Sequence, residues 1–292
     1  NTVLMLHMND DTFKDECGNT VINNGVTLDT NNKVFGDGSA LFNAISDDIV
    51  IPCTPILNLG GSNKDFTIDF WANCKAMLNN SAIVFFTNSV GGGLNENLYI
   101  SVEEGTFRMY YIDINSKLTL IDSSTILQYN IWYHLAVSKK DNNLFIFVNG
   151  KLKSSVQVNT LRSNTQNYNI GSWNQNYDGS FSGNIDEFRI SNIARWTEDF
   201  IPPTREYSRY DYLIKQQNKY YSIKDDNMVE LGIPEDNTQL EEWFNTYGIF
   251  DINQLCKKYN IESFVSQGEV LGNGKLFTFD IPSNMKNINN VD

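Results

Sequence analysis

The feature that most constrains this chain is a succession of short β-forming runs over its first 203 residues, separated by Asn, Asp and Gly. The clearest run is residues 66–72, which alternates at period two, so Phe66, Ile68 and Phe70 share one face and Asp69 lies on the other. No helix of useful length interrupts the runs, and a parallel sheet would need crossover helices. The pattern therefore predicts an antiparallel β-sandwich or jelly roll.

One turn between the runs has a specific chemistry. Asn149-Gly150 joins residues 144–148 to residues 151–153. Asn-Gly between two strand patterns predicts a type I′ hairpin, because this turn needs a positive φ at two successive residues. The same reasoning predicts further strands at residues 3–8, 39–42, 82–87, 98–102, 107–112, 118–121, 131–138 and 181–190.

Composition indicates a globular protein and excludes several functions. Hydrophobic residues make up 41% and aromatic residues 13%, which is enough to form a core. Asp and Glu number 35 against 22 Lys and Arg, and this net charge of −13 argues against a nucleic-acid groove, since phosphate binding needs clustered cations. No apolar stretch reaches the ~18–20 residues that span a membrane. The first residues lack the features of a secretory signal peptide.

The cysteines do not indicate metal or redox chemistry. Cys17, Cys53, Cys74 and Cys256 are scattered and form no CxxC pair. We expect Cys74 to be a small buried thiol. A disulfide between Cys17 and Cys53 is left open.

Six runs occur together in an order that resembles a known family. They are residues 6–19, 35–42, 66–71, 132–136, 144–150 and 183–191. In this order they resemble the laminin-G-like, concanavalin-A-like jelly-roll family, especially its third laminin-G-type subgroup, over about residues 3–204. The resemblance implies a mainly β chain with a concanavalin A-like sandwich at residues 1–204. Residues 193–197 and 200–204 resemble versions found in bacteriophage and prophage tail-associated proteins.

Composition shifts after Pro203, and residues 205–292 are predicted to form a small α+β appendage. Strands are expected at residues 212–215, 219–223 and 228–231, followed by a helix that Asn237 or Thr238 would cap. A second short helix is expected at 251–259 and a hairpin across 272–274. We expect this unit to attach the chain to other tail or surface proteins.

The resemblance also implies a calcium site, because the two ends of such a jelly roll lie side by side and relatives often hold a structural Ca²⁺ there. It points to Asp186 on the last strand with Asn9 and Asp10 after the first, since Ca²⁺ prefers clustered oxygen ligands. Relatives often carry an acid at the position of Asn9, and this departure weakens the site. The alternative is that Asp10-Asp11 is a solvated turn.

Catalytic residues are not evident, and we expect no enzyme activity. A glycosidase needs two carboxylates on one face, whereas Asp186 and Glu187 are adjacent and Asp69 stands alone on its strand. Serine or cysteine catalysis needs a base. His7 and His134 are the only histidines, and both lie in predicted strands, where a structural role is expected.

Carbohydrate binding is the better-supported chemistry, because it needs aromatic surfaces beside Asn and Asp groups. One loop has this composition, and a glycine-rich segment at residues 91–97 is expected to lie near it. The candidate residues are Trp173, Asn174, Asn176, Tyr177, Asp178 and Asn95, which Asn79-Asn80 and Tyr110-Tyr111 are expected to join. The alternative is that Trp173 and Tyr177 are ordinary edge packing.

Together these features predict a non-enzymatic recognition module of a phage or prophage tail, or of an extracellular surface. Its expected partner is a bacterial surface glycan, and its expected cofactor is structural Ca²⁺. One alternative is a structural virion or cell-surface protein that uses the sandwich for protein–protein contacts. Another is a glycan hydrolase.

Overall fold

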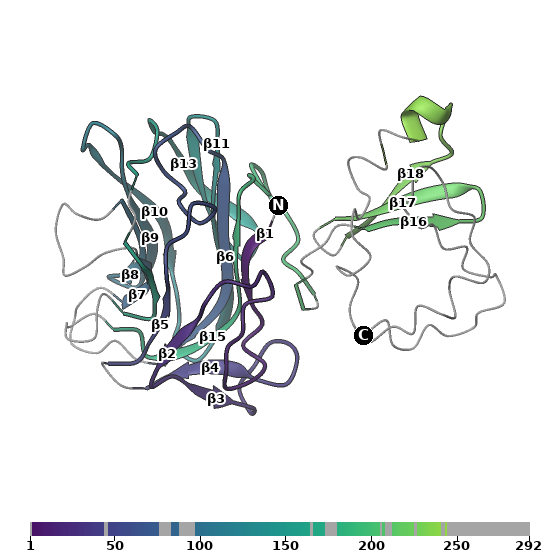
Figure 1. Cartoon of the computed structure of the whole chain (residues 1–292). Helices are drawn as coiled ribbons and strands as arrows, with labels where there is room; N and C mark the ends of the chain where they lie inside the picture. Colours follow the sequence, from purple (N-terminus) through teal and green to yellow (C-terminus); the bar gives the residue numbers. More distant parts are fainter. Residues whose placement is uncertain are drawn as a thin grey trace. The chain divides into compact units, whose positions relative to one another are not determined.

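The computed structural model divides the chain into two compact units, Asn1–Pro202 and Pro203–Asp292 (Figure 1). The sequence placed the boundary two residues later, after Thr204. The structure describes residues 2–43, 46–75, 83–87, 97–163, 166–172, 180–204, 206–207, 212–224, 227–240 and 243.

The first unit is a sandwich of two antiparallel sheets, which lie face to face in Figure 1. Sheet A has the order β13 (Lys151–Gln157), β12 (Asn143–Val148), β11 (Trp132–Lys140), β6 (Phe66–Cys74), β15 (Gly183–Ser191), β4 (Ser39–Phe42) and β3 (Thr27–Asp29), with β1 (Thr2–Leu6) paired to β15. Sheet B has the order β10 (Leu118–Ile126), β9 (Thr106–Ile112), β8 (Leu98–Glu103), β7 (Ile83–Thr87), β14 (Tyr168–Ile170), β5 (Asp48–Ile51) and β2 (Ile22–Asn24). The predicted sandwich is thereby confirmed.

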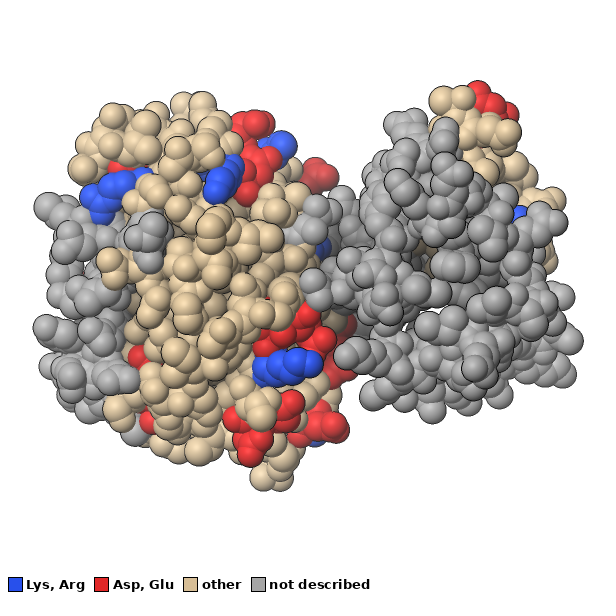
Figure 2. Space-filling view, viewed as in Figure 1, with Lys and Arg blue, Asp and Glu red and all other residues tan. Residues whose placement is uncertain are grey.

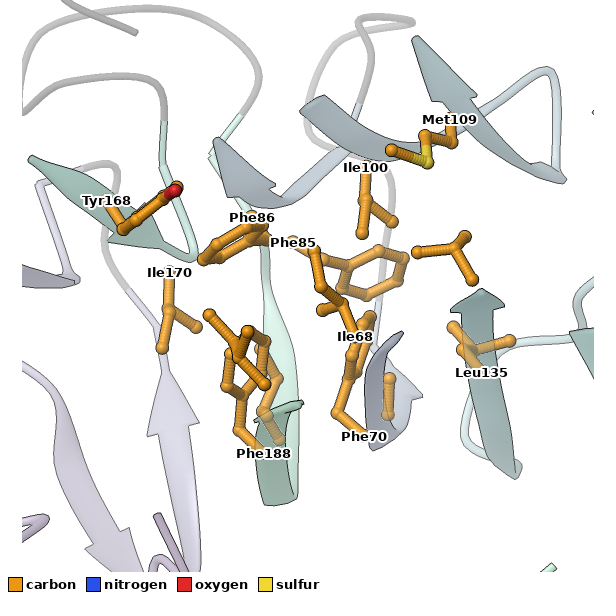
Figure 3. Close-up of a cluster of buried hydrophobic side chains, with 14 of the residues drawn as sticks. Ile68, Phe70, Phe85, Phe86, Ile100, Met109, Leu135, Tyr168, Ile170 and Phe188 are labelled. Atoms are coloured by element: carbon orange, nitrogen blue, oxygen red, sulfur yellow. The ribbon is translucent and has the colours of Figure 1, made fainter. Parts of the chain in front are cut away.

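Aromatic residues from both sheets meet in the core. Figure 3 shows Phe70 of β6 and Phe188 of β15 against Phe85 and Phe86 of β7. The ring centroids are 5.2 Å apart for Phe70 and Phe85, and 5.3 Å apart for Phe86 and Phe188. Tyr168 of β14 stacks on Phe86 at 5.0 Å. All these side chains are fully buried, and each contributes about 1.5–3 kcal/mol of transfer free energy.

The β12–β13 hairpin has the predicted turn. Asn149 has a φ of 49° and Gly150 a φ of 72°, the two positive values that a type I′ turn needs. Gly150 also packs against residues 193–200, which we call the strap. A Cβ at this glycine would lie 2.1 Å from the carbonyl oxygen of Phe200. The turn therefore needs glycine for its backbone angle and for this close approach.

The cysteines of the first unit are free thiols. The disulfide left open for Cys17 and Cys53 is not formed, and their sulfurs donate to the carbonyl oxygens of Thr2 and Thr54. Cys74 is buried as expected, and this burial raises the pKa of its thiol to about 12.

The second unit contains a three-stranded antiparallel meander of β16 (Tyr212–Gln216), β17 (Lys219–Lys224) and β18 (Asn227–Gly232), at the predicted positions. Residues 237–240 are helical. The cap prediction was wrong, because the carboxylate of Asp236 accepts the N–H of Gln239 at 2.8 Å and so caps the helix one residue earlier. The predicted helix at 251–259 and the hairpin across 272–274 lie outside the described residues. Within the described part of both units, no helix has the length and apolarity needed to cross a membrane.

Candidate functional site

A row of cross-strand neighbours lies on the outer face of sheet B. Tyr99 of β8 pairs with Thr87 of β7 on one side and with Tyr110 of β9 on the other, and Tyr110 pairs with Leu120 of β10. The residues beside Tyr99 in the chain, such as Ile100, point into the core, so Tyr99 points outward. The rings of Tyr99 and Tyr110 stack with centroids 4.1 Å apart and an interplanar angle of 14°. We call these two residues the tyrosine pair.

Carboxylates surround a single guanidinium beside the tyrosine pair. Glu103 accepts hydrogen bonds from the hydroxyl of Tyr110 at 2.6 Å and from Arg108 at 3.2 Å. Arg108 also donates to Glu104 at 2.8 Å and to Asp122 at 2.5 Å. The hydrogen bond with Glu104 and those with the other two acids raise the pKa of Arg108 above its usual value. The group is thus a fixed ion-pair network with more negative than positive charge.

A second polar group on this face is buried. Asp48 of β5 is fully buried and accepts hydrogen bonds from the amide of Asn24 at 2.7 Å, the hydroxyl of Ser172 at 3.1 Å and the amide of Asn169 at 3.3 Å. These neutral donors replace the water that the carboxylate loses on burial. Ser172 directly precedes residues 173–179, so Asp48 fixes the last described residue before the segment that the sequence selected.

The predicted carbohydrate-binding residues lie outside the described part of the chain. They are Trp173, Asn174, Asn176, Tyr177, Asp178 and Asn95, and Asn79-Asn80 lies outside it as well. Their flanking residues are described. Strand β14 runs antiparallel to β7. Thr87, which precedes residues 88–96, pairs with Asn169, whereas the N–H of Gly171, two residues before residues 173–179, binds the carbonyl oxygen of Phe85. The two segments therefore start from opposite ends of the β7–β14 pair.

The structure separates Tyr110 from Tyr111. Neighbouring residues of a strand face opposite ways, so Tyr110 lies on the outer face while Tyr111 is buried and donates from its hydroxyl to the carbonyl oxygen of Asn159 at 2.6 Å. Tyr99 was missed by the sequence reasoning. Its signal was present, because Leu98 and Ile100 are apolar on either side of it.

Two of the three predicted calcium ligands, Asp186 and Asn9, bind the backbone of the same segment, residues 34–37. Asp186 accepts the N–H groups of Val34 at 2.8 Å and Phe35 at 3.2 Å through one oxygen, and Asn9 accepts the N–H of Asp37 at 3.1 Å. Asp10 instead accepts from Thr12 in an exposed turn, as the alternative interpretation expected.

The surroundings of Asp186 bear on whether a cation would fit. Its second oxygen, Oδ1, is buried and has no hydrogen-bond partner in the described structure, and burial raises its pKa to about 7. An unpaired buried carboxylate oxygen is suited to a cation. No three His, Cys, Asp or Glu side chains of the described residues are grouped so as to hold a metal. A Ca²⁺ ion here would depend on Asp186, the amide oxygen of Asn9 and neutral oxygens, and the site stays a prediction.

A buried ionic cluster lies on the outer face of sheet A, beneath the strap. Asp69 accepts two hydrogen bonds from Arg189, both at 3.0 Å, and lies 3.4 Å from Nε2 of His134. All three side chains are fully buried. Burial alone would raise the pKa of Asp69, but Arg189 and His134 hold it well below its usual value. Burial lowers the pKa of His134.

Aromatic residues of the strap cover this cluster. Trp196 and Phe200 stack with centroids 3.8 Å apart, and His134 lies 5.9 Å from the first ring and 5.5 Å from the second. His134 therefore has the structural role expected from the sequence. His7 is also paired, with its Nδ1 at 2.8 Å from the carboxylate of Glu187.

Comparison with known proteins places this geometry in a family context. Residues 45–199, just over half of the chain, match the family model described as "Concanavalin A-like lectin/glucanases superfamily". A search of curated proteins finds no match.

Solved structures with a similar fold include binding domains of bacterial toxins. The binding domain of Paraclostridial Mosquitocidal Protein 1 has a TM-score of 0.56 at 15% identity, covering 80% of this chain and 68% of that one. The botulinum neurotoxin serotype G binding domain has a TM-score of 0.54 at 18% identity, with coverages of 76% and 59%. A serotype D ligand-binding domain in complex with N-acetylneuraminic acid has a TM-score of 0.52 at 14% identity, with coverages of 80% and 62%. The chain thus spans about three-fifths of the two neurotoxin domains.

Proposed function

Because the chain belongs to the concanavalin A-like lectin/glucanase superfamily, we propose that it is a non-enzymatic recognition module that binds carbohydrate on the outer face of sheet B. The observation that carries this proposal is the tyrosine pair with the carboxylate of Glu103 beside it. Aromatic rings pack against the C–H groups of sugars, here through the ring edges and faces that the Tyr99–Tyr110 stack leaves uncovered, and fixed carboxylates accept hydrogen bonds from sugar hydroxyls. The ligand complex of the serotype D domain supports a saccharide as the ligand class.

Double substitution of the tyrosine pair tests the site. Tyr99→Ala with Tyr110→Ala removes the aromatic surface, and we expect binding to a glycan array or to bacterial wall polysaccharide to fall by about tenfold or more. Tyr129→Ala is the matched control, because Tyr129 is 46% exposed in the connection between β10 and β11. Equal binding by both variants, with unchanged melting temperatures, would contradict the proposed location.

The finer proposal is a tail-associated receptor-binding protein of a phage or prophage, exposed on a virion or at an extracellular surface. It is supported by the resemblance of residues 193–204 to tail-associated versions of the fold. In this proposal the second unit attaches the sandwich to other tail or surface proteins. Tail genes beside the coding sequence would support it, and a gene neighbourhood without them would contradict it.

A structural role has one specific observation in its favour. Strand β10, at the edge of sheet B, exposes Leu118 by 51%, Leu120 by 46% and Ile126 by 70%. Apolar residues on an edge strand are suited to contacts with another protein. Stable assembly into a larger particle with no glycan binding would favour this alternative. Release of reducing sugar from wall polysaccharide would favour the third candidate, a glycan hydrolase.

A further inference from the structure

The two sheets of the sandwich differ in charge. On the seven strands of sheet B, as the structure describes them, Arg108 is the one basic residue, against the acids Glu103, Asp122 and Asp48. Glu104, in the turn after β8, adds a further negative charge. Sheet A carries five basic residues against four acids: Lys139, Lys140, Lys151, Lys153 and Arg189 against Asp29, Asp69, Asp186 and Glu187. In the view of Figure 2, charged side chains gather around a broad uncharged area of the sandwich.

The one cation of sheet B is fully engaged by the chain itself. Each of the three nitrogens of Arg108 donates to a different carboxylate: Nε to Asp122, Nη1 to Glu103 and Nη2 to Glu104. An anionic ligand would have to displace one of these charge-assisted hydrogen bonds to reach the guanidinium. The tyrosine pair is therefore bordered by excess negative charge, and the guanidinium of Arg108 beside it is already bound to carboxylates of the chain.

The position of Glu104 makes this charge accessible. Its side chain is 83% exposed, whereas Glu103 and Asp122, which also form ion pairs with Arg108, are 19% and 28% exposed. An exposed carboxylate that shares Arg108 with Glu103, the acid bonded to Tyr110, can meet a cationic substituent on a bound sugar. Two unit charges about 6 Å apart in water change affinity roughly threefold, so two excess charges are equivalent to about tenfold.

We infer that the outer face of sheet B selects saccharides that carry a protonated amino group and disfavours acidic sugars. This inference rests on the proposed function. The sugar ring would lie against the tyrosine pair, and its ammonium group would lie on the side of Glu103 and Glu104. The same charge distribution would repel a carboxylated sugar.

Three oligosaccharides of equal length test the inference: a glucosamine tetramer, its fully N-acetylated form and a sialylated tetrasaccharide. Binding is measured by calorimetry on the full chain at a pH of about 6, where amino sugars are protonated. We expect the amine to bind about tenfold more tightly than the N-acetylated form at about 50 mM salt, with most of this advantage lost at about 300 mM. The sialylated ligand should bind most weakly.

Glu104→Gln supplies the matched variant, with Glu198→Gln on the strap as the control, since both side chains are exposed. Glu104→Gln should reduce the advantage of the amine over the N-acetylated form roughly threefold, whereas Glu198→Gln should leave this advantage unchanged. Equal binding of amine and N-acetylated ligands overturns the charge inference and leaves the proposed function standing. Absence of binding by all three ligands overturns the charge inference, and the glycan array with the tyrosine variants then decides on the proposed function.

Discussion

Asp186 is a buried carboxyl group whose charged form is disfavoured by its surroundings. One of its oxygens accepts two backbone N–H groups, from Val34 and Phe35, while the other is buried without a partner. Burial raises its pKa from 3.8 to about 7, so the folded state holds this proton more tightly than the unfolded state. The contribution of this group to stability is therefore full below a pH of about 4 and is lost as the pH rises to about 7.

Asp186→Asn should remove this loss. We expect the variant to be more stable than the natural protein at a pH of about 8 by up to about 4 kcal/mol, with no gain at a pH of about 4. Urea unfolding at the two pH values measures the difference. If the gain were the same at both, the protonation of Asp186 would not be its cause.

Calcium bound at Asp186 would raise the stability of the folded state, whereas loss of the Asp186 proton lowers it. If Ca²⁺ binds Asp186, adding it after EDTA treatment should raise the melting temperature of the natural protein, because a ligand of the folded state stabilises it. Asp186→Asn should show little response. No shift in the natural protein with EDTA or with added Ca²⁺ would contradict the calcium site.

At the level of elements, the strap covers His134 of the buried cluster, and the burial of this histidine makes the stability of the sandwich depend on pH. Burial lowers the pKa of His134. Below a pH of about 6.5 this histidine is therefore protonated more readily in the unfolded chain than in the folded one, and the free energy of unfolding falls. We expect the natural protein to lose up to about 2 kcal/mol more than His134→Gln between a pH of about 8 and about 5. Urea unfolding of both proteins isolates this histidine, because the opposite contribution of Asp186 is common to both. Parallel pH profiles would contradict the assignment.

Comparing Gly150 of the β12–β13 turn with Gly18 separates the cost of backbone strain from the cost of a steric clash. Gly150 has a φ of +72° and a Cβ there would meet the strap, whereas Gly18 has a φ of +85° and open space around its Cβ position. Gly18→Ala should cost about 1 kcal/mol for the backbone alone, and Gly150→Ala about 2–4 kcal/mol. Chemical denaturation gives both values. Equal costs would mean that the contact with the strap is unimportant.

The elements predictable from sequence are those with enough residues to show a period. Residues 66–72 alternate over seven positions, and Asn149-Gly150 defines its turn chemically, so both were predicted. Strands β2, β3, β5 and β14 have only three or four residues and were missed, because so few positions show no alternation. Strand β4 is equally short but was predicted, because Gly36-Asp37-Gly38 marks a turn directly before it.

Candidate sites were less predictable than strands, because they depend on which strands become neighbours. Asp69 and Arg189 are 120 residues apart in the chain, and they meet only because β6 pairs with β15. The tyrosine pair likewise requires the register of β8 against β9. Composition selected residues 173–178 as a loop with binding chemistry, but no sequence period indicates which sheet face such a loop borders.

At the scale of the whole molecule, stability and proposed function both belong to the first unit. Its hydrophobic core draws its buried residues from positions 3–190, within the part of the chain that the structure describes. Residues 1–204 contain 13 Lys and Arg against 21 Asp and Glu, a net charge of −8. The sandwich thus has its own core and enough charge to stay soluble.

We therefore expect residues 1–204 to fold without the rest of the chain. Calorimetry should give one cooperative transition, within a few degrees of the corresponding transition of the full chain, because no buried residue of the core is removed. Glycan binding should be kept within about twofold, since the outer face of sheet B is intact. A melting temperature lowered by ~10 °C or more would mean that the second unit stabilises the sandwich. Loss of binding with an unchanged melting temperature would instead place part of the ligand site in residues 205–292.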